Sequence, residues 1–400
     1  MSLLEELGKE ERWQEFLKDK VSNHRISTKE QEKLQKYIQE KRYLPLANAI
    51  LRQNYVFSYP EKHLINKVDK SKKRVIYTFS EDETMILKMI NYLLYQYDTC
   101  FSPNCYSFRK NIGVKQALKK ITSHPKIDEF CSYKVDISNY FNSIPIPLLL
   151  PKLQPIIGAD TVLYEFFKQL LENNKVVFQG TIIEEQKGIM AGVPISAFLA
   201  NVYLTEMDLY FQKQNVLYAR YSDDIILFCK RQELEKNITQ LEERIQQNGL
   251  QINEQKRAIT KSGEKWEFLG FSYCNGEIDI SDITKKKIKG KIKRASRKIR
   301  RWMLKKNAEK ERALKAMNKK FNQKFYSYQT SDELTWSKWY FPILTTTKGL
   351  EEIDHYMQEN LRYLVTGKYN KKNYEKVGYM LLKSCYYRSL VHEYYKQKRS

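Results

Sequence analysis

Two adjacent carboxylates interrupt a run of residues that otherwise favours a β-strand. The stretch YARYSDDIILF, residues 218–228, is aromatic and β-branched on both sides of Asp223 and Asp224. An ionised carboxylate in apolar surroundings costs several kcal/mol unless it is compensated, and two neighbouring carboxylates also repel each other. Asp is also a favoured turn residue, so a solvated hairpin turn is the favoured interpretation of this stretch taken alone, and other segments must decide.

A second strand-like segment also ends in an acid. In CSYKVDISNYFNSI, residues 131–144, Asp136 lies between Val135 and Ile137. If the two strands lie side by side, Asp136 and Asp223 come together, and converging carboxylate oxygens suit Mg²⁺. Two Mg²⁺ ions held close together are the usual device for phosphoryl transfer by polymerases and nucleases. The paired strands therefore predict metal-dependent chemistry on phosphate.

Alternating strand and helix patterns surround these acids. KKRVIYTF (72–79) predicts a strand, and EDETMILKMINYLLYQY (81–97) predicts a helix with acids in its first turn. ISAFLANVYLTEMDLYF (195–211) repeats apolar residues at helical spacing, and a charged helix over 233–248 precedes Gly249 as a stop. The middle of the chain is therefore α/β or α+β.

The charge of the chain favours a polyanionic partner. Lys and Arg number 70 against 47 Asp and Glu, a formal net charge of +23 over 400 residues. Residues 284–320 alone hold eighteen cations against two acids, with an apolar stripe at helical spacing from Ile288 to Trp302. Nucleic acid is the leading partner, and a membrane surface ranks last because the stripe is narrow and holds one aromatic residue.

Other features exclude some classes of protein. The six cysteines show no CxxC spacing and are expected to be reduced core thiols, and the charged N-terminus does not resemble a secretory signal, so a cytoplasmic protein is expected. The uncharged stretch 188–204 holds Gly, Pro and Asn and is expected to be buried in protein rather than in a membrane. No GxxxxGK[ST] sequence marks a P-loop NTPase.

Several blocks, in order along residues 60–275, resemble the reverse transcriptase family. YSDD between apolar strands resembles the catalytic hairpin, and KVDISNYFNSI is similar to the strand that supplies the first aspartate. The remaining blocks resemble the fingers of bacterial retroelement enzymes, the template-gripping segment, the block ending in a lysine and the primer-grip hairpin: KKRVIYTF with YSFRKNIGVKQAL, GIMAGVPISAFLANVYL, GLQINEQKRAIT and WEFLGFSY.

The resemblance implies a catalytic set. Asp136, Asp223 and Asp224 would bind two Mg²⁺ ions, with Mn²⁺ as a substitute, and the primer 3′-oxygen would attack the α-phosphorus of a deoxynucleoside triphosphate (dNTP). Lys256 matches a lysine proposed to protonate the departing pyrophosphate, while an exposed lysine at a strand end is the alternative.

The resemblance also implies a nucleotide-binding set. Phe141 matches an aromatic residue under the sugar, where a ring would clash with a 2′-hydroxyl; an ordinary core Phe is the alternative. Arg74 and Arg109 match positions that contact the triphosphate, and Arg109 is the stronger candidate because Arg74 lies in a charged stretch. Gly192 and Ser196 belong to the template-gripping segment and are expected to bind nucleotide.

Nucleic-acid contacts are expected from the basic helix, which fits a thumb that follows a duplex through its phosphates, and from the primer grip. A solvated basic surface is the alternative. The expected residues are Lys291, Arg294, Arg297, Lys298, Arg301, Trp266, Leu269 and Gly270. The Tyr-rich C-terminal region either stacks on unpaired bases or forms a helical bundle with a Tyr-rich core, and priming from a tyrosine hydroxyl is left open.

One block departs from its nearest relatives. Met190 and Ala191 stand where retron and group II intron enzymes have Pro and Gln, so the glutamine that packs against the incoming nucleotide is missing. This departure, together with FSEDETMILKMINYLL and CYSFRK, makes the chain most similar to defence-associated and abortive-infection reverse transcriptases.

The expected fold is α+β, a right-hand polymerase with fingers, a palm with an antiparallel sheet, a helical thumb and a helical C-terminal lobe. The expected domains are a helical extension (1–50), fingers and palm (51–275), a basic thumb (276–330) and a Tyr-rich helical region (331–400).

The expected function is an RNA-directed DNA polymerase of bacterial anti-phage defence. It would copy a dedicated structured noncoding RNA, which also serves as scaffold, into a DNA product without a membrane partner. Template-independent DNA synthesis, a retron- or intron-like enzyme and an RNA-binding scaffold with an inactive palm are the alternatives. Oligomerisation is left open.

Overall fold

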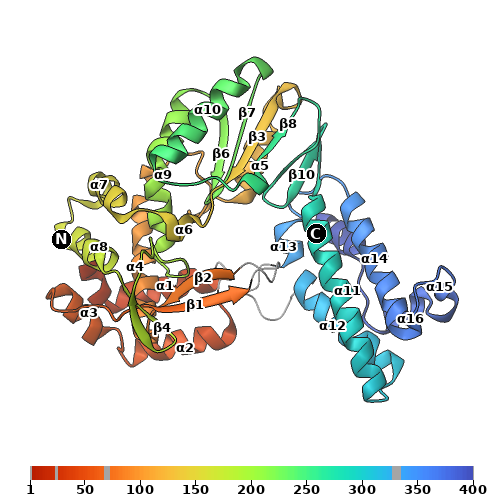
Figure 1. The fold of residues 1–400 in the computed structure, drawn as a ribbon. Helices are drawn as coiled ribbons and strands as arrows, with labels where there is room; N and C mark the ends of the chain where they lie inside the picture. The colour runs from red at the N-terminus through yellow and green to blue at the C-terminus, as the bar shows by residue number, and fades with distance from the viewer. Residues whose placement is uncertain (1, 23–25, 67–72, 327–334, 400) are drawn as a thin grey trace. The chain divides into compact units, whose positions relative to one another are not determined.

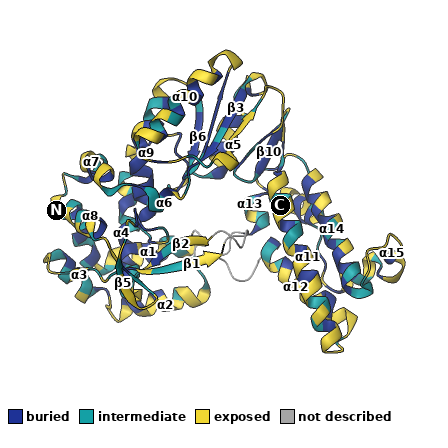
Figure 2. Cartoon of the chain, in the orientation of Figure 1, coloured by how far each residue is buried: buried dark blue, intermediate teal, exposed yellow. Residues whose placement is uncertain are grey.

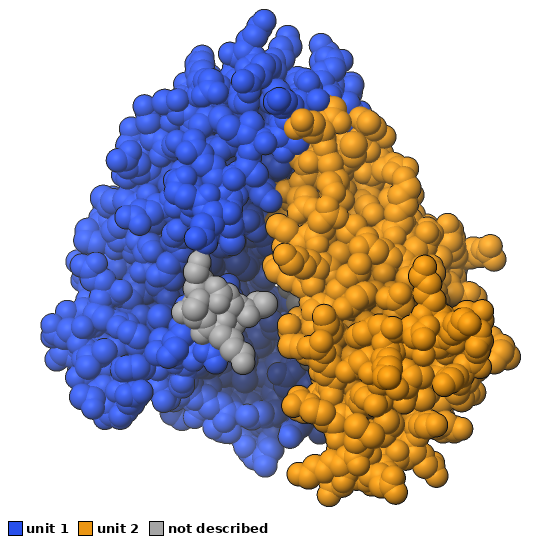
Figure 3. Space-filling model, turned by 45° about the vertical axis from the view of Figure 1, so that its right-hand side comes forward, with its two compact units in different colours: residues 1–262 blue, residues 263–400 orange. Residues whose placement is uncertain are grey.

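The computed structural model describes residues 2–22, 26–66, 73–326 and 335–399, which form two compact units, residues 1–262 and 263–400 (Figures 1 and 3). Each unit is described by itself. The expected division of the chain into four domains stays a prediction.

Unit 1 begins with the predicted helical segment. Ser2 caps the first 3-10 helix. Trp13 is fully buried among these helices and stacks on Tyr43, with ring centroids 4.9 Å apart. The elements are η1 (Leu3–Gly8), α1 (Glu10–Ser22), α2 (Thr28–Gln39) and α3 (Leu44–Leu51).

Two four-stranded sheets follow in unit 1. The first has the order β2-β1-β4-β5 and consists of β1 (Glu61–Asn66), β2 (Lys73–Thr78), β4 (Lys175–Phe178) and β5 (Thr181–Glu184). The second, which we call the palm sheet, has the order β6-β7-β3-β8 with every pair antiparallel. It consists of β3 (Cys131–Asp136), β6 (Leu217–Tyr221), β7 (Asp224–Cys229) and β8 (Ala258–Thr260).

Helices pack on these sheets around one core. Helix α10 packs on β3 and β7, and α9 packs on β6. The helices of unit 1 beyond residue 80 are α4 (Glu81–Leu93), η2 (Leu94–Cys100), α5 (Val114–Thr122), η3 (Ile127–Glu129), α6 (Tyr140–Ser143), α7 (Ile146–Ile157), α8 (Thr161–Glu172), α9 (Ser196–Lys213), α10 (Arg231–Gln247) and η4 (Glu254–Lys256).

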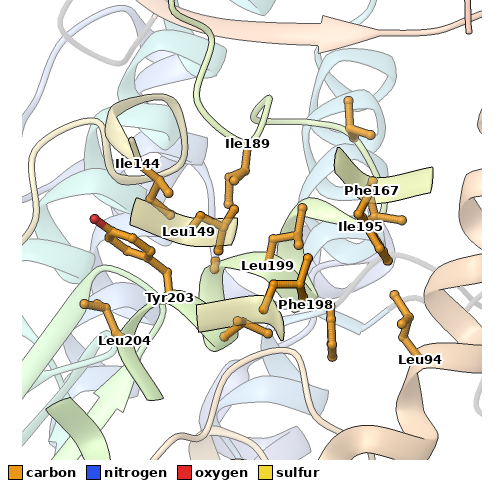
Figure 4. Close-up of a cluster of buried hydrophobic side chains, with 14 of the residues drawn as sticks. Leu94, Ile144, Leu149, Phe167, Ile189, Ile195, Phe198, Leu199, Tyr203 and Leu204 are labelled. Atoms are coloured by element: carbon orange, nitrogen blue, oxygen red, sulfur yellow. The ribbon is translucent and has the colours of Figure 1, made fainter. Parts of the chain in front are cut away.

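Helix α9 is buried on nearly all sides, which accounts for its lack of a polar face. Phe198, Leu199 and Tyr203 of α9 meet Leu149 of α7 and Phe167 of α8 in the core (Figure 4). The uncharged stretch 188–204 therefore lies inside the protein, as predicted. None of the described helices has the length and apolar character needed to cross a membrane.

Unit 2 places helices beside a small antiparallel sheet of order β11-β10-β9. The predicted basic helix is two helices, because α11 ends at Lys305 and Asn307 takes a left-handed φ of 45° before α12. The elements are β9 (Trp266–Phe268), β10 (Phe271–Cys274), β11 (Glu277–Ile280), α11 (Asp282–Lys305), α12 (Lys310–Tyr326), α13 (Trp336–Trp339), α14 (Lys348–Thr366), α15 (Asn373–Lys376), α16 (Tyr379–Ser384) and α17 (Leu390–Arg399).

The predicted α+β class is confirmed, and buried residues concentrate in β3, β6 and β7 and on the inner faces of the helices (Figure 2). All six cysteines are free thiols, and four of them are buried. Cys100 is exposed, so it is not the core thiol that the sequence predicted.

Candidate active site

The three predicted acids meet at one end of the palm sheet. Asp136 ends β3 and is the direct register partner of Asp224, the first residue of β7. Asp223 lies in the two-residue turn between β6 and β7, and its carbonyl oxygen accepts a hydrogen bond from the backbone N–H of Ile137 (3.0 Å). Antiparallel pairing thus brings together carboxylates that lie nearly ninety residues apart in the sequence.

The electrostatics of the acids show that they are crowded. Burial, then the charge of Asp136, raises the pKa of Asp223. Burial, together with the charges of Asp223 and Asp136, raises the pKa of Asp224 to about 6. Because the charge of Asp136 acts on Asp223, and the charges of both act on Asp224, added positive charge would stabilise the ionised forms of Asp223 and Asp224.

Lys256 supplies part of that charge. Its Nζ lies 2.6 Å from Oδ2 of Asp136, and its side chain is 57% exposed. Asn253 donates from its backbone N–H to the carbonyl of Asp136 (2.8 Å) and from Nδ2 to Oδ1 (3.3 Å). The structure therefore brings the predicted Lys256 to the acids.

The turn that carries Asp223 rests on a buried ion pair. Arg220 donates from Nε and Nη2 to Asp208 of α9, and from Nη1 to the carbonyl of Ser222 (3.3 Å). Ser222 has a left-handed φ of 61°, and its backbone N–H donates to Oγ of Ser107 (2.8 Å). Tyr218 also donates its hydroxyl proton to Asp208 (2.8 Å). The ion pair and Ser107 together fix the backbone of the turn.

Oxygen donors of this kind suit a hard divalent cation. Within the described residues, no three Asp, Glu, His or Cys side chains form a ready-made metal site. The donor chemistry and the mutual repulsion of Asp136, Asp223 and Asp224 fit a cation, while their side-chain arrangement is not that of a closed ligand set.

Residues 188–192, which we call the GIMAG loop, are hydrogen-bonded to β2 of the first sheet. Ala191 accepts a hydrogen bond from the backbone N–H of Tyr77 (2.8 Å) and donates its own N–H to Oδ1 of Asn142 (2.8 Å). Gly192 has a φ of 100°, and a Cβ there would lie 3.1 Å from the carbonyl oxygen of Tyr77. Ser196 is buried and donates from Oγ to the carbonyls of Ile189 and Met190. Ser196 therefore holds the loop from its buried side, while the exposed Gly192 allows its close approach to Tyr77.

Phe141 lies on α6, directly after β3, and is partly buried. Its ring makes edge contacts with Phe108 (5.9 Å) and Tyr140 (5.7 Å). Phe108 is 41% exposed and has a left-handed φ of 56°. The partly buried ring of Phe141 therefore packs against an exposed ring.

The two predicted arginines are placed differently. Arg74 is exposed on β2, and its charge is among those that lower the pKa of Asp223 against the larger effect of burial. Arg109 is 7% exposed, pairs with Asp98 (3.1 Å), and donates to the carbonyls of Ser102 and Cys105. Residues 98–105 therefore hold the Arg109 guanidinium, and its predicted contact with the triphosphate stays a prediction.

The predicted nucleic-acid-binding residues of unit 2 also divide into two groups. Five cations of α11 are exposed: Lys291, Arg294, Arg297, Lys298 and Arg301. Burial and the nearby charges of Lys324, Arg294 and Lys287 lower the pKa of Lys291, which shows how closely the cations lie.

Of the predicted hairpin residues of unit 2, Trp266 is buried, and Leu269 and Gly270 are partly exposed. Trp266 is 5% exposed and stacks on Tyr273 (5.0 Å), a burial that disfavours the predicted contact between Trp266 and nucleic acid. Leu269 and Gly270 form the β9–β10 turn with left-handed φ values of 51° and 88°. A Cβ on Gly270 would lie 3.0 Å from the Tyr340 hydroxyl, so this turn packs tightly.

The sequence predictions missed Arg220, Asp208, Asn253 and Asn142. The first two carried a signal, since a charge inside an apolar strand or helix requires a partner. The two asparagines gave none, because their roles depend on which loops meet in the folded chain.

A family model covers the part of the chain that holds the three predicted acids. The family model described as "Reverse transcriptase (RNA-dependent DNA polymerase)" matches residues 65–273, just over half of the chain. No curated protein matches the sequence.

Two solved telomerase structures are similar over part of their length. Apo telomerase from Candida tropicalis, truncated from its C-terminal domain, has 13% identity and a TM-score of 0.44 over 56% of this chain. The chain covers 55% of that telomerase. Telomerase from Candida albicans, in complex with the TWJ fragment of telomeric RNA, has 12% identity and a TM-score of 0.44, with 87% of this chain and 68% of that chain covered.

Proposed function

The chain belongs to the reverse transcriptase (RNA-dependent DNA polymerase) family, and on that premise we propose that it copies a dedicated structured noncoding RNA into DNA in bacterial anti-phage defence. Residues 65–273 are an RNA-directed DNA polymerase domain, a nucleotidyltransferase. One observation carries the catalytic part of the proposal: Asp136 faces Asp224 in register, with Asp223 in the adjoining turn.

The chain's own residues prepare this site for nucleotidyl transfer. Asp136, Asp223 and Asp224 would hold divalent cations, Mg²⁺ or Mn²⁺, which stabilise the attacking and leaving oxygens when bound. Arg220 and Ser107 keep the turn in position. Lys256 holds a proton-bearing Nζ beside Asp136 and is our candidate to protonate the leaving pyrophosphate of the dNTP.

The nucleotide side is proposed from the residues around the acids. The ring of Phe141 would lie under the deoxyribose and disfavour a 2′-hydroxyl. Arg74 is our candidate for the triphosphate, because its charge already acts on Asp223 and its side chain is exposed. Gly192 would let the backbone of the GIMAG loop approach the nucleotide closely.

Unit 2 supports an RNA partner and a DNA product held through phosphates. It carries 32 Lys and Arg against 15 Asp and Glu, a net charge of +17, so most of the chain's +23 lies there. The exposed cations of α11 supply a phosphate-binding surface of the kind a thumb requires.

The defence role is supported by the sequence of the GIMAG loop. Met190 is fully buried with a φ of 61°, and Ala191 is hydrogen-bonded to Tyr77 and Asn142, so burial and hydrogen bonds hold a loop that lacks the Pro and Gln of retron and intron enzymes. A cytoplasmic location is part of the proposal, and six free thiols suit a reducing compartment.

The test is to purify the chain from its native host locus and to sequence the co-purifying RNA and DNA for wild type, Asp223→Asn and Asp128→Asn. Asp128 is an exposed acid on η3 and serves as the matched control. We expect wild type and Asp128→Asn to carry one discrete RNA together with its complementary DNA. Asp223→Asn should carry the same RNA without the DNA.

Other outcomes select the alternatives. DNA unrelated to the RNA would overturn templating and favour template-independent synthesis. Absence of DNA from all three proteins, before and after phage infection, would favour an RNA-binding scaffold.

A further inference from the structure

An exposed tyrosine of unit 2 is held in a strained backbone conformation. Tyr386 is 64% exposed and has a φ of 68°. A bulky side chain seldom adopts this left-handed region, and such strain persists only where the surrounding structure enforces it. The backbone of Tyr386 is thus constrained while its ring is exposed to solvent.

The end of α16, where the backbone N–H of Tyr387 donates to the carbonyl of Leu382 (2.9 Å), and two asparagines of α12 hold this conformation. Asn318 donates from Nδ2 to the carbonyl of Cys385, and Asn322 donates from Nδ2 to the carbonyl of Tyr386, both at 2.8 Å. Cys385 and Tyr387 on either side are buried, and Tyr387 donates its hydroxyl proton to Asp354 (3.0 Å). Only the ring of Tyr386 is directed outward from this fixed segment.

Cations and an open hollow surround the exposed ring. Nζ of Lys315 lies 5.9 Å from the ring centroid, which is within cation–π range. A hollow of about 390 Å³ adjoins the ring and is lined by Lys315, Ala316, Lys319, Asn322, Gln323 and Tyr386. Among the described residues, neither lysine has a carboxylate within ion-pair distance, so both charges are available to a phosphate.

We propose that Tyr386, Lys315 and Lys319 form a stacking site for an unpaired nucleotide of single-stranded RNA. The base would stack on the tyrosine ring and the adjoining phosphates would contact the two lysines. Because the backbone that carries the ring is already fixed, stacking costs little conformational entropy. The identity of the strand as RNA rests on the proposed function.

The test measures RNA affinity by fluorescence anisotropy with the full chain at about 150 mM salt. The probe is a labelled oligoadenylate RNA of about ten nucleotides. Tyr386→Asn removes the ring but keeps a residue that tolerates a left-handed φ, so the fold is preserved. Tyr386→Phe keeps the ring. Tyr374→Asn is the matched control, because Tyr374 is also exposed on unit 2, at 59%.

We expect Tyr386→Asn to weaken binding of the single strand about tenfold, and Tyr386→Phe to stay within about twofold of wild type. Affinity for an RNA duplex of the same length should not change, since paired bases do not offer a free face. Wild-type affinity in Tyr386→Asn, an equal loss on the duplex, or an equal loss in Tyr374→Asn would each overturn the proposal. A loss seen only with single-stranded DNA would overturn the assignment to RNA.

This experiment is separate from the test of catalysis. Asp223→Asn should abolish DNA synthesis and yet retain the dependence of RNA binding on Tyr386. Failure of the stacking site thus leaves the polymerase assignment intact, and failure of polymerase activity leaves the binding result interpretable.

Discussion

Arg220 and Asp208 form an ion pair that lies wholly inside unit 1, with Nη2 of Arg220 2.5 Å from Oδ2 of Asp208. The pair joins β6 to α9 directly beneath the turn that carries Asp223. Because the same guanidinium also donates to the carbonyl of Ser222, the stability of unit 1 and the position of the Asp223 turn depend on one side chain.

Removing one partner should therefore destabilise the chain strongly. Arg220→Met leaves Asp208 buried and uncompensated, and we expect a loss of about 3–5 kcal/mol in the free energy of unfolding. Urea unfolding measures it. The double variant Arg220→Met with Asp208→Leu should recover part of the loss, and a single-variant loss under about 1 kcal/mol would contradict this role of the pair.

Gly192→Ala should impair both stability and DNA synthesis. The φ of 100° disfavours any side chain, and the new Cβ would press on the carbonyl of Tyr77. We expect a stability loss of about 1 kcal/mol or more, and a raised KM for dNTP. Gly180→Ala is the control, because Gly180 has a φ of 82° but no atom near its missing Cβ. Equal effects on KM in both variants would exclude a specific role for the GIMAG loop.

Lys187 should make stability depend on pH in the alkaline range. It is buried and donates to the carbonyl of Asn173, and burial lowers its pKa to about 8 from the ordinary 10.5. Below pH 8 the charged form is buried at full cost, whereas between pH 8 and 10.5 the unfolded state binds more protons, so stability rises with pH.

The matched variant isolates this effect. The stability of wild type relative to Lys187→Met, from urea unfolding at pH 7, 8 and 9, should increase with pH. A difference that stays constant over this range would show that the buried ammonium is not the cause.

The exposed cations of α11 should account for part of the salt dependence of nucleic-acid binding. The triple variant Arg297→Gln, Lys298→Gln and Arg301→Gln should lower the slope of log affinity against log salt by about 2–3. The control replaces Lys29, Lys33 and Lys36 of α2, which are equally exposed. An unchanged slope in the α11 variant would show that these three cations do not contact the phosphates of the bound nucleic acid.

The sequence was enough to predict an element or a site where the local residue pattern agrees with the tertiary structure. The strand-like runs around Asp136 and Asp223, taken together with the order of the family blocks, predicted that the acids meet, and the register of β3 and β7 confirms it. The sequence did not reveal that Arg109 pairs with Asp98, because a motif position does not show a local partner. Trp266 of β9 stacks on Tyr273 of β10 inside unit 2. The sequence did not show that this face of β9 is buried, because that depends on how the strands pair.

The central claim is that the three acids carry DNA synthesis, and primer extension on an RNA template with Mg²⁺ and dNTPs tests it most directly. Asp223→Asn should fold as wild type does and lose about a hundredfold or more of the synthesis rate, while Asp128→Asn stays at the wild-type rate. Synthesis by well-folded Asp223→Asn at the wild-type rate would contradict the account.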